Sequence, residues 1–534
     1  MNSTKPLPEN KPEEESASSK NEQLNVQPDS QTPEKLPEEK PAGIVRKGID
    51  TTGAIVKGGA ELGIKGAEKG AEITEKGFEV AGKSLELVGK GVEATGKGVQ
   101  YAGKGVEYTG VVVEGEVKSG LKYLSGIIKN RRGIKDFFWK SKRGVITGSA
   151  DNDPSGIVTY TQIGAIAGFQ LLWLCLVAWP LLTVVEEMSA RIGVVTKKGV
   201  NSIVIENYGR AWAYLATLII LICNTFTMGA DIAAMADVAS ILTKIPELVY
   251  ILLLGGIFFW LLWTKGYQAI SRYLFLLTPF FLLYIGSALF LNVPWGEVLK
   301  NTLVPTLGSI NMSFALIAVA FLGTTLTPFL IYWEATQEIE ENKTVAKLHD
   351  ESIGVTSGMF FSQFIAFFII VAAAAVFAGA NHELNSAREI ALAFKPLGKM
   401  SFLLYSLGIL GSGFLAIPVM AASTGYTFSE TFGWKKGLDQ PYSKAKGFYA
   451  VMILTLIFGV AIALLKFNPV LALVYSQVLN GLLMPVLVVL LLFICNNKKI
   501  MGQHTNRVWS NIFGFLALIV LVLADFALIF QWLK

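Results

Sequence analysis

From about residue 131 onward, the chain consists of long apolar runs that alternate with short polar links. A helix that spans the hydrocarbon core of a membrane needs roughly 20 predominantly apolar residues. Eleven runs meet this length, so the sequence predicts an all-α polytopic membrane protein. The predicted spans are residues 144–168, 170–192, 212–241, 248–264, 273–292, 312–336, 354–379, 400–426, 447–465, 469–495 and 510–533.

The first 130 residues differ from this pattern. Residues 1–42 are rich in Pro, Glu, Ser and Lys, and they hold too little apolar surface to offset the entropy of ordering, so we expect disorder. Within residues 43–130 a seven-residue pattern repeats as GKSLELV, GKGVEAT, GKGVQYA and GKGVEYT. This spacing predicts a marginal amphipathic helix that needs a membrane surface, a partner or a second copy of itself. A flexible Gly-rich tether is the alternative.

Several classes of function are excluded by composition. The three cysteines and three histidines lack metal-site spacing, so neither a disulfide framework nor a histidine metal cage is expected; they are Cys175, Cys223, Cys495, His349, His382 and His504. No nucleophile–base pair and no nucleotide-binding loop stands out, so we expect neither an enzyme nor a resident cofactor. The net charge of +5 is unevenly distributed along the chain and does not predict a nucleic-acid partner.

Basic residues in the links predict the orientation in the membrane. Lys and Arg are about three times as frequent in the links on one side as on the other, and the richer side is expected to be cytoplasmic. The sequence therefore predicts a multi-pass cell-membrane protein whose N-terminus is cytoplasmic. With an odd number of spans, the C-terminus lies outside. The opening MNSTKPLPENKPEEE has no apolar core, so no cleavable signal peptide is expected.

Two spans are interrupted in the same way. Span 1 contains SADNDPSG at 149–156, and span 6 contains GTTLTPF at 323–329. A proline inside a helix removes a hydrogen bond, and within a membrane the freed backbone groups have to be buried in protein or face water. Each break lies in the first helix of a five-helix half, which predicts an inverted-repeat transporter with its site near the midplane. A plain proline kink is the alternative.

Asp153 lies beside the first break. A charge inside the membrane costs several kcal/mol unless it is solvated, paired or bound to a metal. Together with free carbonyls, Asp153 predicts a cation site that is lined by oxygen atoms. Asp151 would point elsewhere on a helix, where it either lines an approach path or faces water, and we favour the latter. Near the end of span 2, Glu187 and Arg191 are four residues apart and are expected to pair, which makes them structural together with Glu186.

Two stretches resemble the NRAMP divalent-metal transporters. The first runs from Ala150 through TYTQIGAIAGF to EEMSARIGVVTKKG, and the second is YSQVLNGLLMP at 475–485 followed by LLLFICNNKKIMG. The resemblance marks residues 131–534 as an NRAMP-like transporter domain. It implies a LeuT-type fold, in which two inverted repeats of five helices and an eleventh helix support alternating access.

The resemblance also implies a set of site residues. In the family's span-1 motif Asp-Pro-Gly-Asn, Asp153 matches, Gly156 replaces the metal-contacting asparagine, and the carbonyl of Ala150 keeps its place. In the span-6 motif Met-Pro-His, Thr327 replaces the thioether ligand, and Thr324 occupies the place of the carbonyl ligand. Further matching positions are Gln477 in span 10, Asp231 in span 3 and, one turn after the span-6 break, Glu334 in place of a histidine.

These departures have a chemical direction. A thioether favours transition metals, whereas a site of oxygens suits Mg²⁺, which keeps several waters. The implied metal site is Asp153, Ala150, Thr324, Thr327, Gln477 and Gly156, with Asp231 and Glu334 as ion-path residues. The chain thus resembles the NRAMP-related magnesium transporters, with Mn²⁺ as a competitor. The family's span-6 histidines and its span-3 glutamate are missing, which predicts no tight proton coupling.

Two other functions remain open at this stage. The first is proton-coupled uptake of Mn²⁺ or Fe²⁺, the usual activity of the family. The second is a membrane sensor that binds metal without turnover and signals through residues 1–130. The expected partners are a divalent metal ion as substrate and the lipid bilayer.

Overall fold

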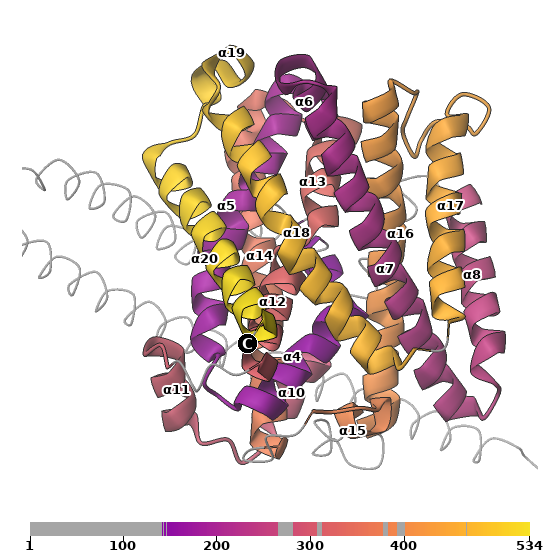
Figure 1. Cartoon of the computed structure of the whole chain (residues 1–534), viewed down its shortest axis with the longest axis vertical. Coiled ribbons are helices and arrows are strands. Elements are labelled where there is room, and N and C mark those ends of the chain that lie inside the picture. The colour runs from indigo at the N-terminus through magenta and orange to yellow at the C-terminus, as the bar shows by residue number, and fades with distance from the viewer. Residues whose placement is uncertain are drawn as a thin grey trace, which may run out of the picture. The chain divides into compact units, whose positions relative to one another are not determined.

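The computed structural model describes residues 141, 144–145, 147–264, 281–306, 312–377, 383–391, 401–465 and 467–533. They belong to one compact unit, Gly126–Lys534. The predictions for residues 1–42 and 43–130 lie outside the described residues. Within the described ranges every regular element is a helix (Figure 1).

Most predicted spans appear as long helices. Nine stretches of the described chain are long and apolar enough to cross a membrane. They are α5 (Leu172–Thr196), α7 (Arg210–Thr243), α8 (Glu247–Thr264), α12 (Met312–Thr325) continued by α13 (Pro328–Glu340), α14 (Leu348–Phe377), α16 (Ser401–Phe432), α17 (Lys446–Ala463), α18 (Pro469–Asn496) and α20 (Val508–Leu533).

The two remaining predicted spans are also represented. Span 1 contains α4 (Pro154–Ala167), and the described part of span 5 contains α10 (Leu282–Leu289). The links contain short helices that the apolar pattern did not predict, because they are too short or too polar to form a span; they are α6 (Val200–Tyr208), α11 (Trp295–Leu303), α15 (Ala387–Ala391) and α19 (Lys498–Met501).

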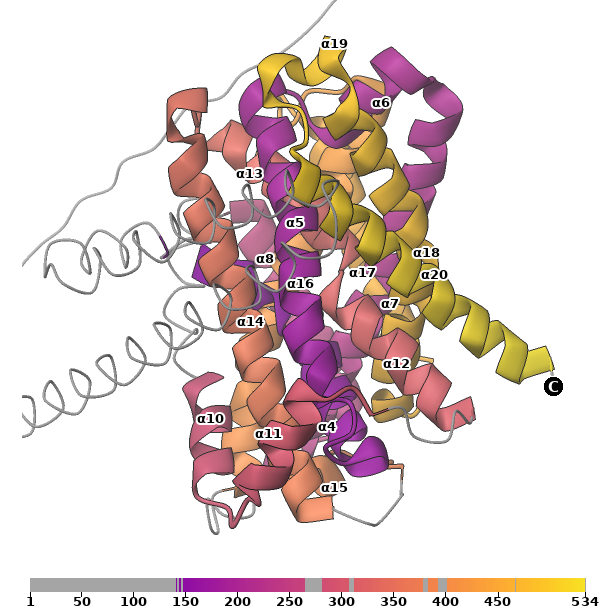
Figure 2. The ribbon, with the colours of Figure 1, turned by 90° about the vertical axis from the view of Figure 1, so that its left-hand side faces the viewer.

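The two halves of the bundle pack in equivalent ways. The helix of span 1, α4, packs against the helix of span 7, α14, and correspondingly α13 of span 6 packs against α5 of span 2. Figure 2 shows α12 and α13 at different heights of the bundle, as two halves of one interrupted span. Because the same pairing recurs in both halves, the packing agrees with the predicted repeat of five and five helices.

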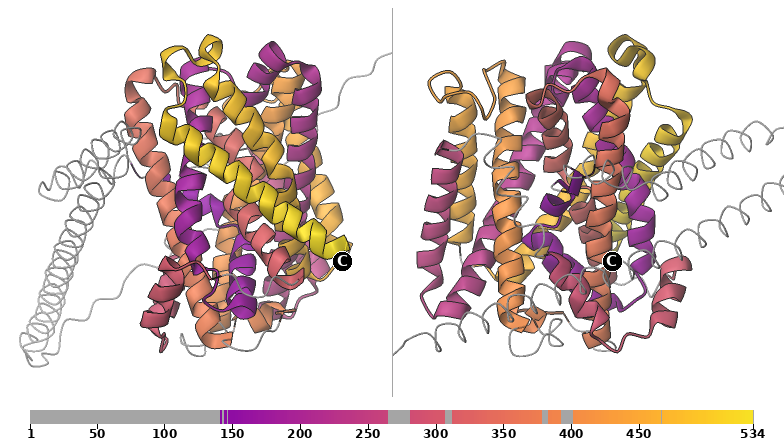
Figure 3. Two further views of the ribbon diagram at one scale, coloured as in Figure 1. Left: turned by 60° about the vertical axis from the view of Figure 1, so that its left-hand side comes forward. Right: turned by 180° about the vertical axis from the view of Figure 1, so that it is seen from behind.

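The eleventh helix, α20, lies outside this core. It contacts α18, α12 and α5, and Figure 3 shows it crossing the bundle obliquely on the outside. Many of its large apolar side chains are exposed, including Phe515, Leu523 and Phe526. A helix whose outer face is this apolar is suited to contact with lipid.

Small residues bring the core helices into close contact. A Cβ atom added at Gly148 would overlap the backbone carbonyl of Gly358, and one added at Gly193 would lie 3.1 Å from the Cα atom of Ala335. Without an apolar driving force between helices in lipid, such backbone contacts and interhelical hydrogen bonds hold a membrane bundle together. They fix the positions of the two interrupted spans.

Candidate metal centre

Span 1 is broken at residues 152–153, as SADNDPSG predicts. Helical geometry ends at Asp151, and Asp153 has an extended backbone with φ −66° and ψ 173°. Helix α4 then begins at Pro154, and Asp153 Oδ1 accepts a hydrogen bond of 2.5 Å from the Gly156 N–H. Aspartate at the N-cap followed by proline in the first turn is a strong signal to start a helix, so the sequence itself restarts the span here.

Span 6 is broken in the matching position. Helix α12 ends at Thr325, Leu326 and Thr327 are not helical, and α13 begins at Pro328. Thr327 has an extended backbone, with φ −85° and ψ 131°. Helix ends leave backbone carbonyls and N–H groups without partners inside the helix, so each break exposes polar backbone inside the bundle.

The two breaks face each other. A Cβ atom added at Gly156 would lie 2.8 Å from Thr324 Oγ1 and 3.2 Å from Asp153 Oδ1, so these three residues share one small space. Thr327, on the other side of the span-6 break, lies beside the carboxylate of Asp151. The side chains of both breaks are fully buried.

Helix α18 completes the site from a third direction. A Cβ atom added at Gly323 would overlap the backbone carbonyl of Gln477, so α18 contacts α12 directly beside Thr324. The Oε1 atom of Gln477 accepts a hydrogen bond of 2.9 Å from Asn480, and its Nε2 atom has no partner. Gln477 is therefore adjacent to the broken part of span 6.

Buried polar atoms without hydrogen-bond partners gather around the breaks. Seven of them are Asp151 Oδ1, Asn152 Oδ1, Asp153 Oδ2, Asp231 Oδ2, Thr324 Oγ1, Thr327 Oγ1 and Gln477 Nε2. Leaving one such atom unsatisfied costs about 1–3 kcal/mol, so a group of them indicates a place for a polar ligand. Six of the seven are oxygen atoms, the ligands that hard cations prefer.

The donor set is oxygen-rich but not a cage of carboxylates. Within the described residues, no compact group of three or more His, Cys, Asp and Glu side chains is positioned to hold a metal ion. A cation at the breaks would thus be held by Asp153, by hydroxyl and backbone oxygens, and by water.

Asp231 lies at the first break, where it is hydrogen-bonded to the start of α4. On α7, its Oδ1 atom accepts hydrogen bonds from the Ser155 N–H at 3.1 Å and from Ser155 Oγ at 2.6 Å. Ser155 directly follows Pro154, so Asp231 holds the first turn of α4 and brings a second carboxyl group near Asp153. The sequence identified Asp231 as an ion-path residue, and the structure places it at the site.

Asp151 corrects one expectation. We predicted that it would face water, but it is fully buried, and Ser362 on α14 donates a hydrogen bond to its Oδ2 atom. Its neighbour Asn152 was not singled out, and it donates to Gly148 O at 3.0 Å and to Ser362 Oγ at 3.2 Å. Helical periodicity did not predict this burial, because the helix ends at Asp151 and the hydrogen-bond partner, Ser362, lies 211 positions later in the sequence.

Two further residues that the family resemblance implied, Ala150 and Glu334, lie on the helices next to the breaks. Ala150, buried at 2% exposure, lies in the helical segment just before the first break. Glu334 lies on α13, six positions after Pro328, and is 5% exposed. It is thus buried along α13 beyond the break and not part of the break itself.

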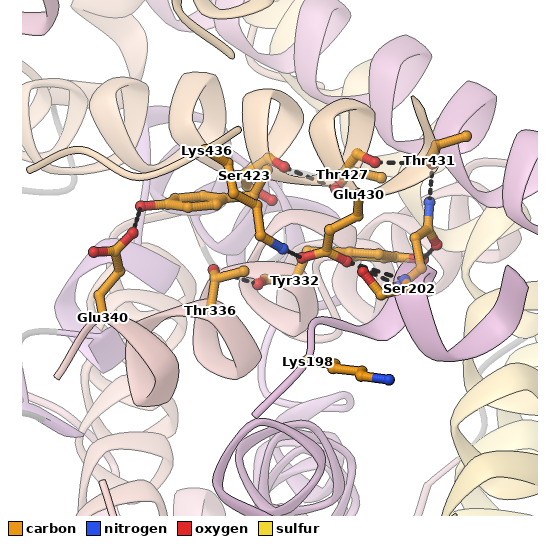
Figure 4. A network of polar contacts seen from close by, with 12 residues as sticks. Lys198, Ser202, Tyr332, Thr336, Glu340, Ser423, Thr427, Glu430, Thr431 and Lys436 are labelled. Atoms are coloured by element: carbon orange, nitrogen blue, oxygen red, sulfur yellow. Dashed lines mark hydrogen bonds and ion pairs between the residues drawn. The ribbon is translucent and has the colours of Figure 1, made fainter. Parts of the chain in front are cut away.

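A second polar region lies toward the end of the bundle that carries α6 and α19. Tyr332 on α13 donates to Asn201 Oδ1 at 2.9 Å, and the Asn201 N–H donates to Glu430 Oε2 on α16 at 3.0 Å (Figure 4). Glu430 also forms an ion pair with Lys436. In contrast to the breaks, these groups satisfy one another, so the network fastens α13 to α6 and α16.

A bundle with two facing, interrupted helices and unsatisfied oxygens between them defines an inverted-repeat membrane carrier. The chain matches the family model described as natural resistance-associated macrophage protein-like over residues 144–531, and it belongs to this family. The predicted fold class, an all-α membrane protein with a LeuT-type inverted repeat, is confirmed.

Curated relatives agree with this assignment. The divalent metal cation transporter MntH of Caldanaerobacter subterraneus subsp. tengcongensis is 25% identical over 402 residues, which cover 72% of this chain and 90% of the relative. The MntH of Deinococcus radiodurans is 24% identical over 428 residues, covering 75% and 92%. Among solved structures, a manganese transporter of Eremococcus coleocola has a TM-score of 0.64 at 16% identity, covering 75% of this chain and 88% of that one.

Proposed function

We propose that the chain is a secondary transporter that carries divalent cations, Mg²⁺ first and Mn²⁺ as a competitor, by alternating access and without tight proton coupling. Transport of a divalent metal is supported by the family and by relatives named as divalent metal cation transporters. The preference for Mg²⁺ is supported by the side chains at the two breaks.

The observation that carries the ion preference is Thr327 at the span-6 break. It occupies the position of the family's thioether, and its buried hydroxyl has no hydrogen-bond partner. With Asp153 and Thr324 it makes a donor set of oxygens, and replacement of the family's asparagine by Gly156 removes one more side-chain ligand. Fewer direct ligands leave coordination positions to water, which Mg²⁺ gives up reluctantly.

The geometry of the interrupted spans supports the proposal of alternating access. Each break separates a span into two short helices joined by non-helical residues, and such residues can absorb changes in φ and ψ. Asp153 and Asp231 remain attached to the start of α4, so the ion stays with this half-helix while the halves around it rearrange.

We also propose that the end carrying α6 and α19 is cytoplasmic. Lysines concentrate there, between α5 and α6, after α16 and in α19; they are Lys197, Lys198, Lys435, Lys436, Lys498 and Lys499. An excess of basic residues in short links marks the cytoplasmic side. Helix α20 runs away from the α19 end (Figure 1), which supports a C-terminus on the opposite side of the membrane.

Flux in liposomes tests the proposal. The full chain is reconstituted, and influx of Mg²⁺, Mn²⁺, Fe²⁺ and Ca²⁺ is recorded together with internal pH. We expect Mg²⁺ and Mn²⁺ influx without matching acidification. Acidification that scales with metal influx would establish proton-coupled symport instead, and saturable metal binding without flux would favour a sensor.

Replacing Thr327 by Met tests the oxygen-ligand argument. The thioether of T327M introduces a soft ligand at the span-6 break, so transport should shift from Mg²⁺ toward Mn²⁺ and Cd²⁺. We expect the ratio of Cd²⁺ to Mg²⁺ flux to rise about tenfold, which corresponds to about 1.4 kcal/mol of discrimination. T327S, which keeps the hydroxyl, serves as the control. An unchanged ratio in T327M would contradict the ligand role of Thr327.

A further inference from the structure

Glu186 on α5 is fully buried at the level of the span-6 break. Ser189 Oγ donates to the carbonyl of Ile331 on α13, and one turn later Gly193 packs on Ala335, so the two helices run in the same direction in fixed register. Three positions before Ser189 is Glu186, and three positions before Ile331 is Pro328, where α13 begins. The register therefore places Glu186 beside the start of α13.

Within the part of the chain that the structure describes, the carboxylate of Glu186 has no hydrogen-bond or ion-pair partner. Both of its oxygens are buried and accept no hydrogen bond, and the residue has 0% exposure. A carboxylate removed from water without compensation costs several kcal/mol. Its neighbour Glu187 is only half-buried, and Arg191 donates to Asn506 Oδ1 at 2.8 Å instead of forming the pair with Glu187 that the spacing predicted.

The charged groups of the described chain that act on Glu186 are acidic. Glu334 on α13 and Asp151 at the span-1 break both act electrostatically on its carboxylate. Asp151 in turn has one oxygen, Oδ1, that is buried and without a partner. Glu186 thus lies within electrostatic range of carboxylates from two other helical segments, and both Glu186 and Asp151 have buried oxygens without a hydrogen bond.

We propose that Glu186 is part of a second cation site, at which a hydrated divalent cation is held through its waters between Glu186, Asp151 and Glu334. This inference rests on the proposed function, because it adds a second cation-binding site to the same transport path. The site is distinct from the ligand set around Asp153 and Thr324, and it lies between the breaks and the α6 end of the bundle.

Contact through water explains why the three carboxylates do not form a compact ligand set. A hydrated Mg²⁺ ion presents water hydrogens to its surroundings, so acceptors one water layer away from the metal satisfy it. Carboxylates that are spread over several ångströms fit this shell better than they would fit a bare ion. A cation there would offset the repulsion among the three charges and satisfy both oxygens of Glu186.

The test compares Glu186→Gln with Glu187→Gln in the full chain. Both variants remove one negative charge from adjacent positions of α5, and glutamine keeps the size of glutamate. Outer-shell partners of metal sites typically contribute 10-fold to 100-fold to affinity, so E186Q should raise the Mg²⁺ concentration for half-maximal flux at least about tenfold. E187Q should stay within about twofold of the parent.

Binding measurements separate this site from the one at Asp153. Titration of purified chain with Mg²⁺ in a calorimeter should give one fewer bound ion for E186Q, whereas Asp153→Asn should lose the other ion and keep this one. If E186Q matches E187Q in both flux and stoichiometry, the inference is wrong even where D153N abolishes transport. If the parent chain itself does not transport Mg²⁺ but E186Q still binds one ion fewer than the parent, the transport proposal fails and the site stands. A melting temperature of E186Q equal to that of the parent would show that the variant retains the fold.

Discussion

Asp153→Asn is expected to lower Mg²⁺ and Mn²⁺ flux by about 100-fold or more, because removing one partner from a buried charged pair typically costs 3–5 kcal/mol. Asp153 contributes a carboxylate at the first break whose Oδ2 atom is buried and free for a ligand. Asparagine keeps the shape and can still accept the hydrogen bond from Gly156, so α4 keeps its N-cap. Loss of flux in D153N would therefore be due to loss of the negative charge and not to loss of the N-cap of α4.

Asp525→Asn is the matched control for D153N. Asp525 is also an aspartate in a membrane-spanning helix, but it lies on α20 outside the five-plus-five core. D525N removes the same charge and should retain parental flux. Asp153→Ala adds a second comparison, because losing the N-cap as well costs about 1 kcal/mol of stability. If D153N transports Mg²⁺ as well as D525N does, the metal site is not at the breaks.

The positions of the breaks could be predicted from sequence because their causes are local. Proline forbids a continuous helix, and Asp153 directly before Pro154 supplies the N-cap that starts the next one. Thr327 before Pro328 has the same arrangement, although threonine makes no capping bond there. Span boundaries were similarly predictable, since a run of apolar residues needs no information about its neighbours.

The partners of the buried acids could not be predicted, because they come from distant parts of the chain. Asp151 is bonded to Ser362, and Asp231 is bonded to Ser155, across separations of 211 and 76 residues. Glu186 was assigned a structural role together with the expected Glu187–Arg191 pair, but the register of α5 on α13 places it beside the breaks. For such residues, helical periodicity predicts on which face of the helix a side chain lies, but it does not predict which residues pack against that face.

A backbone contact between span 1 and α14 positions the first break. A Cβ atom added at Gly358 would lie 2.7 Å from the Cα atom of Gly144 and would overlap its carbonyl, and Gly148 makes the reciprocal contact with Gly358. Four positions beyond Gly358, Ser362 binds both Asp151 and Asn152. The distance between span 1 and α14 therefore determines whether Ser362 can form hydrogen bonds with Asp151 and Asn152.

Gly358→Val is accordingly expected to destabilise the protein by about 3 kcal/mol, the upper part of the range for overpacking, because the new side chain meets backbone that cannot change rotamer. Gly256→Val is the control: Gly256 also lies inside a membrane-spanning helix, α8, and a Cβ atom there has nothing within 4 Å. Thermal unfolding in detergent should show G358V melting well below the parent while G256V melts with it. Since displacement of α14 also removes Ser362 from Asp151, the remaining folded G358V should transport Mg²⁺ poorly. Equal melting temperatures and equal flux for G358V and G256V would show that this contact does not set the geometry of the break.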